Sequence, residues 1–229
     1  MTGMSEQELL PCVETETGAN PQHAVIWLHG LGADGNDFVP VVPELGLPDN
    51  LPVRFLFPHA PYQPITCNNG YVMRAWYDIV FFEDIKRHAD IAGVQASVAA
   101  IRALIARENA RGIPTANIVL AGFSQGGAIA YTAGLLHPEK LAGIVALSTY
   151  LPAPELLTDA AMRRANTATP VMACHGSHDP VVPVQLGQAA HDAVRDFGNP
   201  VSWHTWPIQH SVCLPEIQLI GQYLTRVFS

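Results

Sequence analysis

Short apolar runs recur along the chain, and segments with a longer period separate them. The strand-like runs lie at residues 24–28, 54–57, 117–121, 142–147, 170–174 and 201–205. A stretch of four to eight largely apolar residues is typical of a strand that is buried on both faces of a sheet. We therefore expect each of these segments to form a strand.

The segments between these strands carry the period of a helix. After the second strand, five apolar residues recur at the spacing of one helix face, namely Ile91, Val94, Val98, Ile101 and Ile105. Gly112 and Pro114 are expected to end this helix. Further helices are expected from residue 127 to 136, from 185 to 197 and from 215 to 228. Alternating buried strands and helices predict an α/β fold with a mainly parallel sheet and helices on both faces.

One stretch between a strand and a helix has the spacing of a catalytic turn. Residues 122–126 read Gly-Phe-Ser-Gln-Gly, directly after the apolar run that ends at Ala121. A G-x-S-x-G between strand and helix is the pattern of a nucleophile elbow, whose glycines leave room for a strained turn. The pattern predicts Ser124 as a nucleophile; the alternative is that Ser124 only caps the following helix.

A serine nucleophile needs a histidine base and an acid that orients the histidine. Asp179 follows the strand at 170–174, and His210 follows the strand at 201–205, each on a loop before a helix. The chain order serine, acid, histidine is the order found in one large class of serine hydrolases. Alternatives are a helix cap for Asp179 and a surface role for His210. The neighbouring His175 and His178 are expected to be structural, and His191 and His204 lack a loop position.

The acyl-transfer transition state also needs preorganised donors for its oxyanion. The backbone N–H of Gln125 follows the nucleophile, and the glycine-rich loop at residues 29–35 follows an early strand. We assign the second donor to the backbone N–H of Leu31. The alternative is a phosphate-binding loop, because Gly30, Gly32 and Gly35 match G-x-G-x-x-G, although that match alone is a weak signal.

Composition excludes several other classes of function. The 229 residues carry a formal net charge of -8, which argues against nucleic acid or an anionic membrane as the main partner. Because residues 1–16 are polar and acidic and no apolar run approaches the length of a membrane span, we expect neither a secretory signal nor a membrane-spanning segment. The four cysteines show no C-x-x-C spacing, so we expect reduced thiols in a cytoplasmic protein, without a zinc site. We treat residues 1–229 as a single domain, with residues 1–22 as an N-terminal extension or edge strand.

Together these motifs resemble the phospholipase/carboxylesterase family, which includes bacterial carboxylesterases and acyl-protein thioesterases. The matching motifs occur in order as His29-Gly30-Leu31-Gly32, Pro58-His59-Ala60-Pro61, Trp76-Tyr77-Asp78-Ile79, Gly122-Phe123-Ser124-Gln125-Gly126-Gly127, His175-Gly176 with Asp179-Pro180, and His210. The resemblance implies an α/β-hydrolase fold, no metal or cofactor, the triad Ser124, Asp179 and His210, and oxyanion donors at Leu31 and Gln125. It implies carboxylic esters, acyl thioesters or lysophospholipids as substrates, and it allows a homodimer.

The acyl pocket is expected near two stretches that differ from many relatives, residues 80–84 and 147–152. The candidate pocket residues are Trp76, Phe81, Phe82, Tyr150 and Leu151, with ordinary packing as the alternative for each. We therefore predict a serine carboxylesterase that acts through an acyl-enzyme. The alternatives are a main role as acyl-protein thioesterase or lysophospholipase, a peptidase on the same fold, and a non-catalytic receptor for an acyl ligand.

Overall fold

A seven-stranded sheet forms the centre of the protein. The structure is a computed structural model that describes residues 9–83 and 86–229, and for residues 81–89 it describes no side chains. The strands lie in the order β1-β3-β2-β8-β9-β10-β11. Their bounds are β1 (Cys12–Glu16), β2 (His23–Leu28), β3 (Val53–Pro58), β8 (Ile118–Phe123), β9 (Gly143–Leu147), β10 (Val171–Gly176) and β11 (Val201–Trp206). Strand β1 pairs antiparallel with β3 at the edge of the sheet, and the other pairs are parallel.

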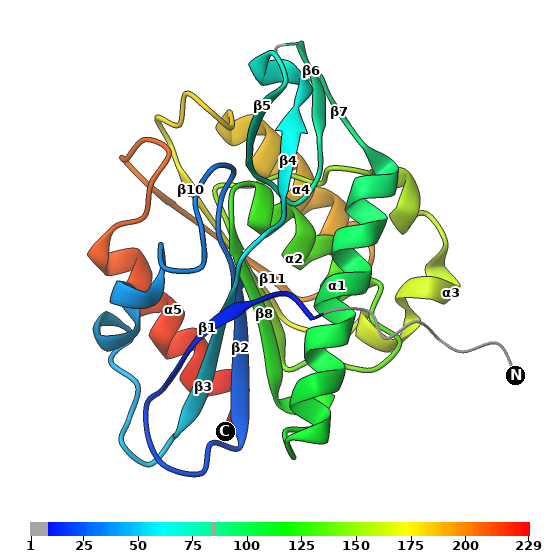
Figure 1. Cartoon of the computed structure of the whole chain (residues 1–229). Coiled ribbons are helices and arrows are strands. Elements are labelled where there is room, and N and C mark those ends of the chain that lie inside the picture. Colours follow the sequence, from blue (N-terminus) through cyan, green and yellow to red (C-terminus); the bar gives the residue numbers. More distant parts are fainter. Residues whose placement is uncertain (1–8, 84–85) are drawn as a thin grey trace, which may run out of the picture.

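Helices cover both faces of this sheet (Figure 1). They are α1 (Ile91–Ala110), α2 (Gln125–Leu135), α3 (Ala160–Arg163), α4 (Val184–Asp196) and α5 (Leu214–Val227). Short 3₁₀ helices lie at η1 (Val39–Leu45), η2 (Thr66–Asn68), η3 (Thr115–Asn117), η4 (Pro154–Leu157) and η5 (Arg164–Asn166). The expected α/β fold with a mainly parallel sheet is confirmed.

Successive residues of one central strand face two different cores. Ile26 of β2 belongs to a core with Val98 of α1, whereas Val25 belongs to a core with Ile220 of α5. Side chains alternate between the faces of a strand. Both faces of β2 must therefore be apolar, which is why the sequence there reads as an uninterrupted apolar run.

Two small hairpins interrupt the alternation of strands and helices between β3 and α1. Strands β4 (Tyr62–Ile65) and β5 (Tyr71–Arg74) form the first, and β6 (Ile79–Glu83) and β7 (Lys86–Ala89) form the second. Both stand beyond one end of the central sheet, at the top of Figure 1. The apolar pattern of the sequence does not predict this excursion. It brings residues 75–79 close to the turn at Ser124, where Trp76 and Tyr77 are hydrogen bonded to the side chain of Gln125.

Within the described residues, no helix combines the length and the apolar character that crossing a lipid bilayer would require.

Candidate active site

Ser124 occupies a sharp turn between β8 and α2. Its backbone has φ 53° and ψ -122°, a conformation that residues other than glycine rarely adopt. The turn is close-packed: a Cβ on Gly122 would lie 2.4 Å from the backbone of Gly126, and a Cβ on Gly126 would lie 2.4 Å from the carbonyl oxygens of Leu28 and His29. Gly122 therefore lets the end of β8 close against the start of α2, and Gly126 lets the turn pack against the end of β2.

Hydrogen bonds on both sides of Ser124 hold the strained turn. The Ser124 N–H donates to Leu147 O at 2.8 Å, and Thr149 Oγ1 donates to Ser124 O at 2.6 Å. Both partners come from the end of β9 and the loop that follows it. The strain at the turn is thus balanced by contacts from the neighbouring strand.

The loops after β10 and β11 bring Asp179 and His210 to the serine. His210 Nε2 lies 2.9 Å from Ser124 Oγ, and His210 Nδ1 lies 2.7 Å from Asp179 Oδ2. Because an ionised carboxylate only accepts hydrogen bonds, the proton of neutral His210 resides on Nδ1. Nε2 is then left as the acceptor for the hydroxyl proton of Ser124.

Asp179 is held as a carboxylate by several donors. Its Oδ1 accepts from the backbone N–H groups of Val181 and Val182, each at 2.8 Å. Burial raises the pKa of Asp179, but the hydrogen bond from His210 and those from the two backbone N–H groups outweigh burial, so the pKa lies below its usual value. The acid is therefore ionised where it faces the imidazole.

His175 lies beside this acid without reaching the serine. Its Nε2 donates to Val182 O at 2.8 Å, and it lies 3.6 Å from Asp179 Oδ2. Burial lowers the pKa of His175, so the ring is neutral and supports the acid loop. His191 belongs to α4 and His204 to β11, away from loop positions.

The loop after β2 presents its backbone to Ser124 through an ordered histidine. His29 Nε2 accepts from the Ala60 N–H at 3.1 Å, so Nδ1–H donates to Gly30 O at 2.7 Å. Burial lowers the pKa of His29, which keeps the ring neutral. In a trans peptide the carbonyl and the next N–H point in opposite directions. The Leu31 N–H is therefore turned away from His29.

Two backbone donors remain free beside Ser124. Across the described part of the chain, neither the Leu31 N–H nor the Gln125 N–H has a protein acceptor. The Gln125 N–H opens α2, and the N-terminus of a helix carries a partial positive charge. The side chain of Gln125 is used elsewhere: Oε1 accepts from the Trp76 N–H at 2.9 Å, and Nε2 donates to Tyr77 O at 2.7 Å.

A cavity of about 240 Å³ opens above these groups. Its lining consists of Gly30, Leu31, Ala33, Asp37, Ile79, Phe123, Ser124, Gln125, Tyr150, Val181 and His210. Four of these residues were not predicted to line a pocket: Asp37, Ile79, Phe123 and Val181. Phe123 lies in the elbow motif and Ile79 ends the motif that begins at Trp76, so both could have been found from the sequence. Asp37 and Val181 reach the cavity only through the way distant loops meet.

Of the five expected pocket residues, Tyr150, Trp76 and Leu151 have described side chains, and these lie in three different places. Tyr150 lines the cavity, and its hydroxyl is hydrogen bonded to that of Tyr77 at 2.9 Å. Trp76 does not line it: the ring is buried behind the loop after β2 and donates from Nε1 to His29 O at 2.9 Å. Leu151 packs instead in the core between α2 and α4. Phe81 and Phe82 belong to β6, and their side chains lie outside the described ones.

The order of the sheet, with a sharp serine turn between a strand and a helix, defines the α/β-hydrolase class of proteins. The chain matches the family described as Phospholipase/Carboxylesterase over residues 10–228. It therefore belongs to this family, and it is a serine hydrolase that acts on esters. This confirms the family resemblance and the predicted class of enzyme.

The alignments with known relatives cover nearly the whole chain. Acyl-protein thioesterase 1 of Neurospora crassa is 39% identical, over 95% of this chain and 90% of the relative. Acyl-protein thioesterase 1 of Mycosarcoma maydis is 36% identical, over 94% and 95%. Among solved structures, Arabidopsis thaliana SOBER1 superposes with a TM-score of 0.82 at 30% identity, over 90% of this chain and 99% of that one. Esterase PE8 superposes with a TM-score of 0.81 at 27% identity, over 96% and 100%.

Proposed function

We propose that Ser124, His210 and Asp179 are the catalytic triad of this esterase. The observation that carries the proposal is the continuous hydrogen-bonded chain from Asp179 Oδ2 through the His210 ring to Ser124 Oγ. The strained turn supports the same assignment, because it raises Ser124 at the end of β8 next to two free backbone donors.

The geometry supports acyl transfer in two steps. His210 Nε2 takes the proton of Ser124 Oγ as that oxygen attacks the ester carbonyl carbon. The carbonyl oxygen becomes an oxyanion, which accepts hydrogen bonds from the N–H groups of Leu31 and Gln125. The carbon–oxygen bond to the alcohol then breaks, and the alcohol leaves with the proton from His210. Water then attacks the acyl carbonyl carbon and gives a proton to His210. As the bond between that carbon and Ser124 Oγ breaks, His210 returns the proton to Ser124 Oγ and the carboxylic acid leaves.

The cavity favours esters with small acyl groups as substrates. Its volume of about 240 Å³ lies below the roughly 300–1,000 Å³ of pockets that hold drug-sized ligands. Tyr150, which is only 5% exposed and is tied to Tyr77, forms part of its wall. A rigid wall of this kind limits the length of chain that can enter behind the carbonyl carbon.

Acyl thioesters are the second candidate substrates. The relatives from Neurospora crassa and Mycosarcoma maydis are named acyl-protein thioesterase 1. The same triad would cleave a thioester by the same two steps, with a thiol as the leaving group. Lysophospholipids belong with the long-chain substrates that the small cavity disfavours.

The test is kcat/KM on p-nitrophenyl esters from acetyl to palmitoyl, with acyl thioesters of matched chain length. Ser124→Ala serves as the background at every chain length. The proposal predicts the highest kcat/KM at short chains and loss of turnover in the variant. A maximum at long chains would refute the small acyl site, whereas retained turnover in Ser124→Ala would refute the nucleophile.

A further inference from the structure

Residues 74–77 lie between the two hairpins, behind the loop that follows β2, and we call them the bridging segment. The segment runs from the last residue of β5 toward β6. Ala75, Trp76 and Tyr77 are each at most 1% exposed. No residue of the segment lines the cavity above Ser124. The segment can therefore act on the reaction only through residues that do line this cavity.

The bridging segment holds the loop after β2 on both sides of Leu31. The Gly32 N–H donates to Arg74 O at 2.9 Å, and the Trp76 Nε1–H donates to His29 O at 2.9 Å. The rings of Trp76 and His29 also lie together, with their centroids 5.3 Å apart. The Leu31 N–H thus belongs to a stretch of backbone that is fixed before it and after it.

The same segment holds the first residue of α2 through its side chain. Gln125 Oε1 accepts from the Trp76 N–H at 2.9 Å, and Gln125 Nε2 donates to Tyr77 O at 2.7 Å. Gln125 is only 2% exposed, so these bonds satisfy an amide that is shielded from water. An oxyanion needs only the backbone N–H of this residue. The bridge to the segment therefore gives a physical reason for glutamine at position 125.

We propose that Trp76 is a positioning residue that fixes the two oxyanion donors relative to each other. The inference rests on the proposed function, in which the N–H groups of Leu31 and Gln125 bind the oxyanion. Trp76 takes part in both links, because its indole N–H holds His29 and its backbone N–H holds Gln125. Donors stabilise a developing charge best when they are already in place. Loosening either link should therefore slow the reaction rather than weaken the binding of substrate.

The test is Trp76→Phe, which removes the indole N–H and keeps an aromatic ring. On a short-chain p-nitrophenyl ester, kcat should fall by about tenfold or more with KM within about threefold, because displaced donors cost rate. A short alkyl trifluoromethyl ketone forms a tetrahedral adduct with the nucleophile, and its Ki should rise by the factor by which kcat/KM falls. The acid limb of the kcat/KM profile should stay in place, because His210 keeps its hydrogen bonds.

Gln125→Met is the second variant, and it interrupts the link on the side of α2. It keeps the backbone N–H of residue 125 but removes both hydrogen bonds of the side chain. It should show the same fall in kcat with little change in KM. Circular dichroism and urea unfolding establish which variants are folded, and Gln125→Met decides the question if Trp76→Phe does not fold.

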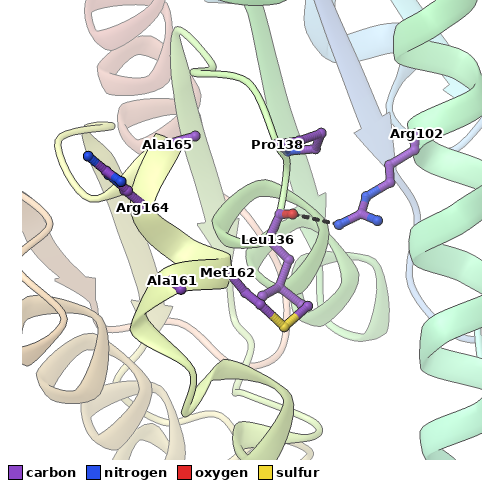
Figure 2. Close-up of a pocket in the computed structure, with 7 residues that line it drawn as sticks. All are labelled: Arg102, Leu136, Pro138, Ala161, Met162, Arg164 and Ala165. Atoms are coloured by element: carbon purple, nitrogen blue, oxygen red, sulfur yellow. Dashed lines mark hydrogen bonds between the residues drawn. The ribbon is translucent and has the colours of Figure 1, made fainter.

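Two matched variants separate positioning from a general loosening of the fold. Trp27→Phe makes the same replacement on β2, at a tryptophan that is 1% exposed and whose indole N–H has no acceptor among the described residues. Arg102→Met removes a donor at the far end of α2, where Figure 2 shows Arg102 Nη2 bonded to Leu136 O at 2.5 Å. Both variants should keep kcat within about twofold of the unaltered enzyme.

The outcomes distinguish this proposal from that of the nucleophile. Unchanged kcat in Trp76→Phe and Gln125→Met, or an equal fall in the two matched variants, would overturn the positioning role. A rise in KM alone would also overturn it, and so would a shifted acid limb, which would place the effect on His210. Turnover retained in Ser124→Ala refutes the nucleophile instead, whereas an inactive Ser124→Ala beside a fully active Trp76→Phe refutes only the positioning role.

Discussion

Asp179 determines which nitrogen of His210 carries the proton. The carboxylate accepts from Nδ1 and thereby leaves Nε2 free to accept from Ser124 Oγ. The two backbone N–H groups that bind Asp179 Oδ1 fix the direction of the other oxygen. At the scale of single residues, the proposed chemistry therefore depends on a carboxylate that remains ionised and correctly oriented.

Asp179→Asn should lower kcat by about 10,000-fold, as replacing the acid of such a triad does when the imidazole takes the wrong tautomer. An asparagine can donate to Nδ1, which would move the proton to Nε2. The measurement is kcat on a short-chain ester, with circular dichroism to show that the variant is folded. Asp192→Asn on α4 is the matched control and should keep full activity. Activity of Asp179→Asn within tenfold of the unaltered enzyme would contradict this role.

The residues proposed for catalysis are largely those that local sequence rules can find. Ser124 lies in a fixed motif, and Asp179 and His210 take loop positions that follow from strand order. Trp76, by contrast, is predicted as a pocket residue, with ordinary packing as the alternative, and the structure gives it the packing role. Its placement behind His29 depends on the fold of the β4–β5 excursion, which no local pattern specifies. Asp37 and Val181 reach the cavity for similarly non-local reasons.

At the scale of elements, the β8–α2 turn joins the position of the nucleophile to the packing of the sheet. The turn can approach β2 only because Gly126 has no side chain, since a Cβ there would lie 2.4 Å from the carbonyl oxygens of Leu28 and His29. The same contact places the loop after β2, with its Leu31 N–H, next to Ser124. One close approach thus positions both the proposed nucleophile and a proposed oxyanion donor.

Gly126→Ala should destabilise the protein by about 3 kcal/mol or more, because backbone atoms cannot move away from the added methyl group as a flexible side chain could. The measurement is the free energy of unfolding in urea, together with kcat/KM. Gly46→Asn is the control: its φ of 63° suits asparagine, and no atom lies within 4 Å of an added Cβ. Equal stability of the two variants would contradict the packing argument.

The main elements follow from sequence because their apolar patterns are strong. The parallel strands are buried on both faces, and the long helices have clear starts and ends. The hairpins β4–β5 and β6–β7 cannot be predicted from the apolar pattern, because their strands are short. In the first hairpin the apolar residues Tyr62, Tyr71 and Val72 are exposed, so they do not mark a buried face. The antiparallel pairing of β1 with β3 depends on a contact between segments about forty residues apart along the chain.

At the scale of the whole molecule, a buried ion-pair network ties α1 to the edge of the sheet. Glu108 is fully buried, and its carboxylate pairs with Arg54 of β3 at 2.9 Å and with Arg111 at 2.9 Å. Glu14 of β1 pairs with Arg107 and Arg111, each at 2.8 Å. The network joins three segments that are far apart in sequence, and sequence periodicity contains no signal for it.

Glu108→Gln should reduce the free energy of unfolding by about 3 kcal/mol, because it leaves partly buried guanidinium groups without their carboxylate. Glu14→Gln removes a more exposed carboxylate from the same network, so a loss of about 1 kcal/mol or less is expected. Urea unfolding of both variants at one pH gives the comparison. A larger loss in Glu14→Gln than in Glu108→Gln would contradict the importance of the buried carboxylate.

A second buried acid makes the stability of the molecule depend on pH. Glu216 of α5 is 1% exposed, and burial raises its pKa from 4.5 to about 7. Between these values the folded state binds more protons than the unfolded state, so stability falls as the pH rises through this window. By pH 8 the free energy of unfolding has fallen by about 3 kcal/mol on account of Glu216.

Glu216→Gln should remove this loss, because an amide remains neutral at every pH. Relative to the unaltered protein, the variant should gain about 3 kcal/mol in free energy of unfolding between pH 4.5 and pH 8. Unfolding in urea across this range is the measurement. Glu139→Gln, at an exposed position, should show no such gain. Parallel pH profiles for Glu216→Gln and the unaltered protein would contradict the assignment.

The central claim, that Ser124 is the activated nucleophile, is tested most directly by labelling the protein with a fluorophosphonate and locating the adduct by mass spectrometry. We predict one adduct, on Ser124, and no labelling of the Ser124→Ala variant. An adduct on a different residue, or undiminished labelling of the variant, would contradict the account.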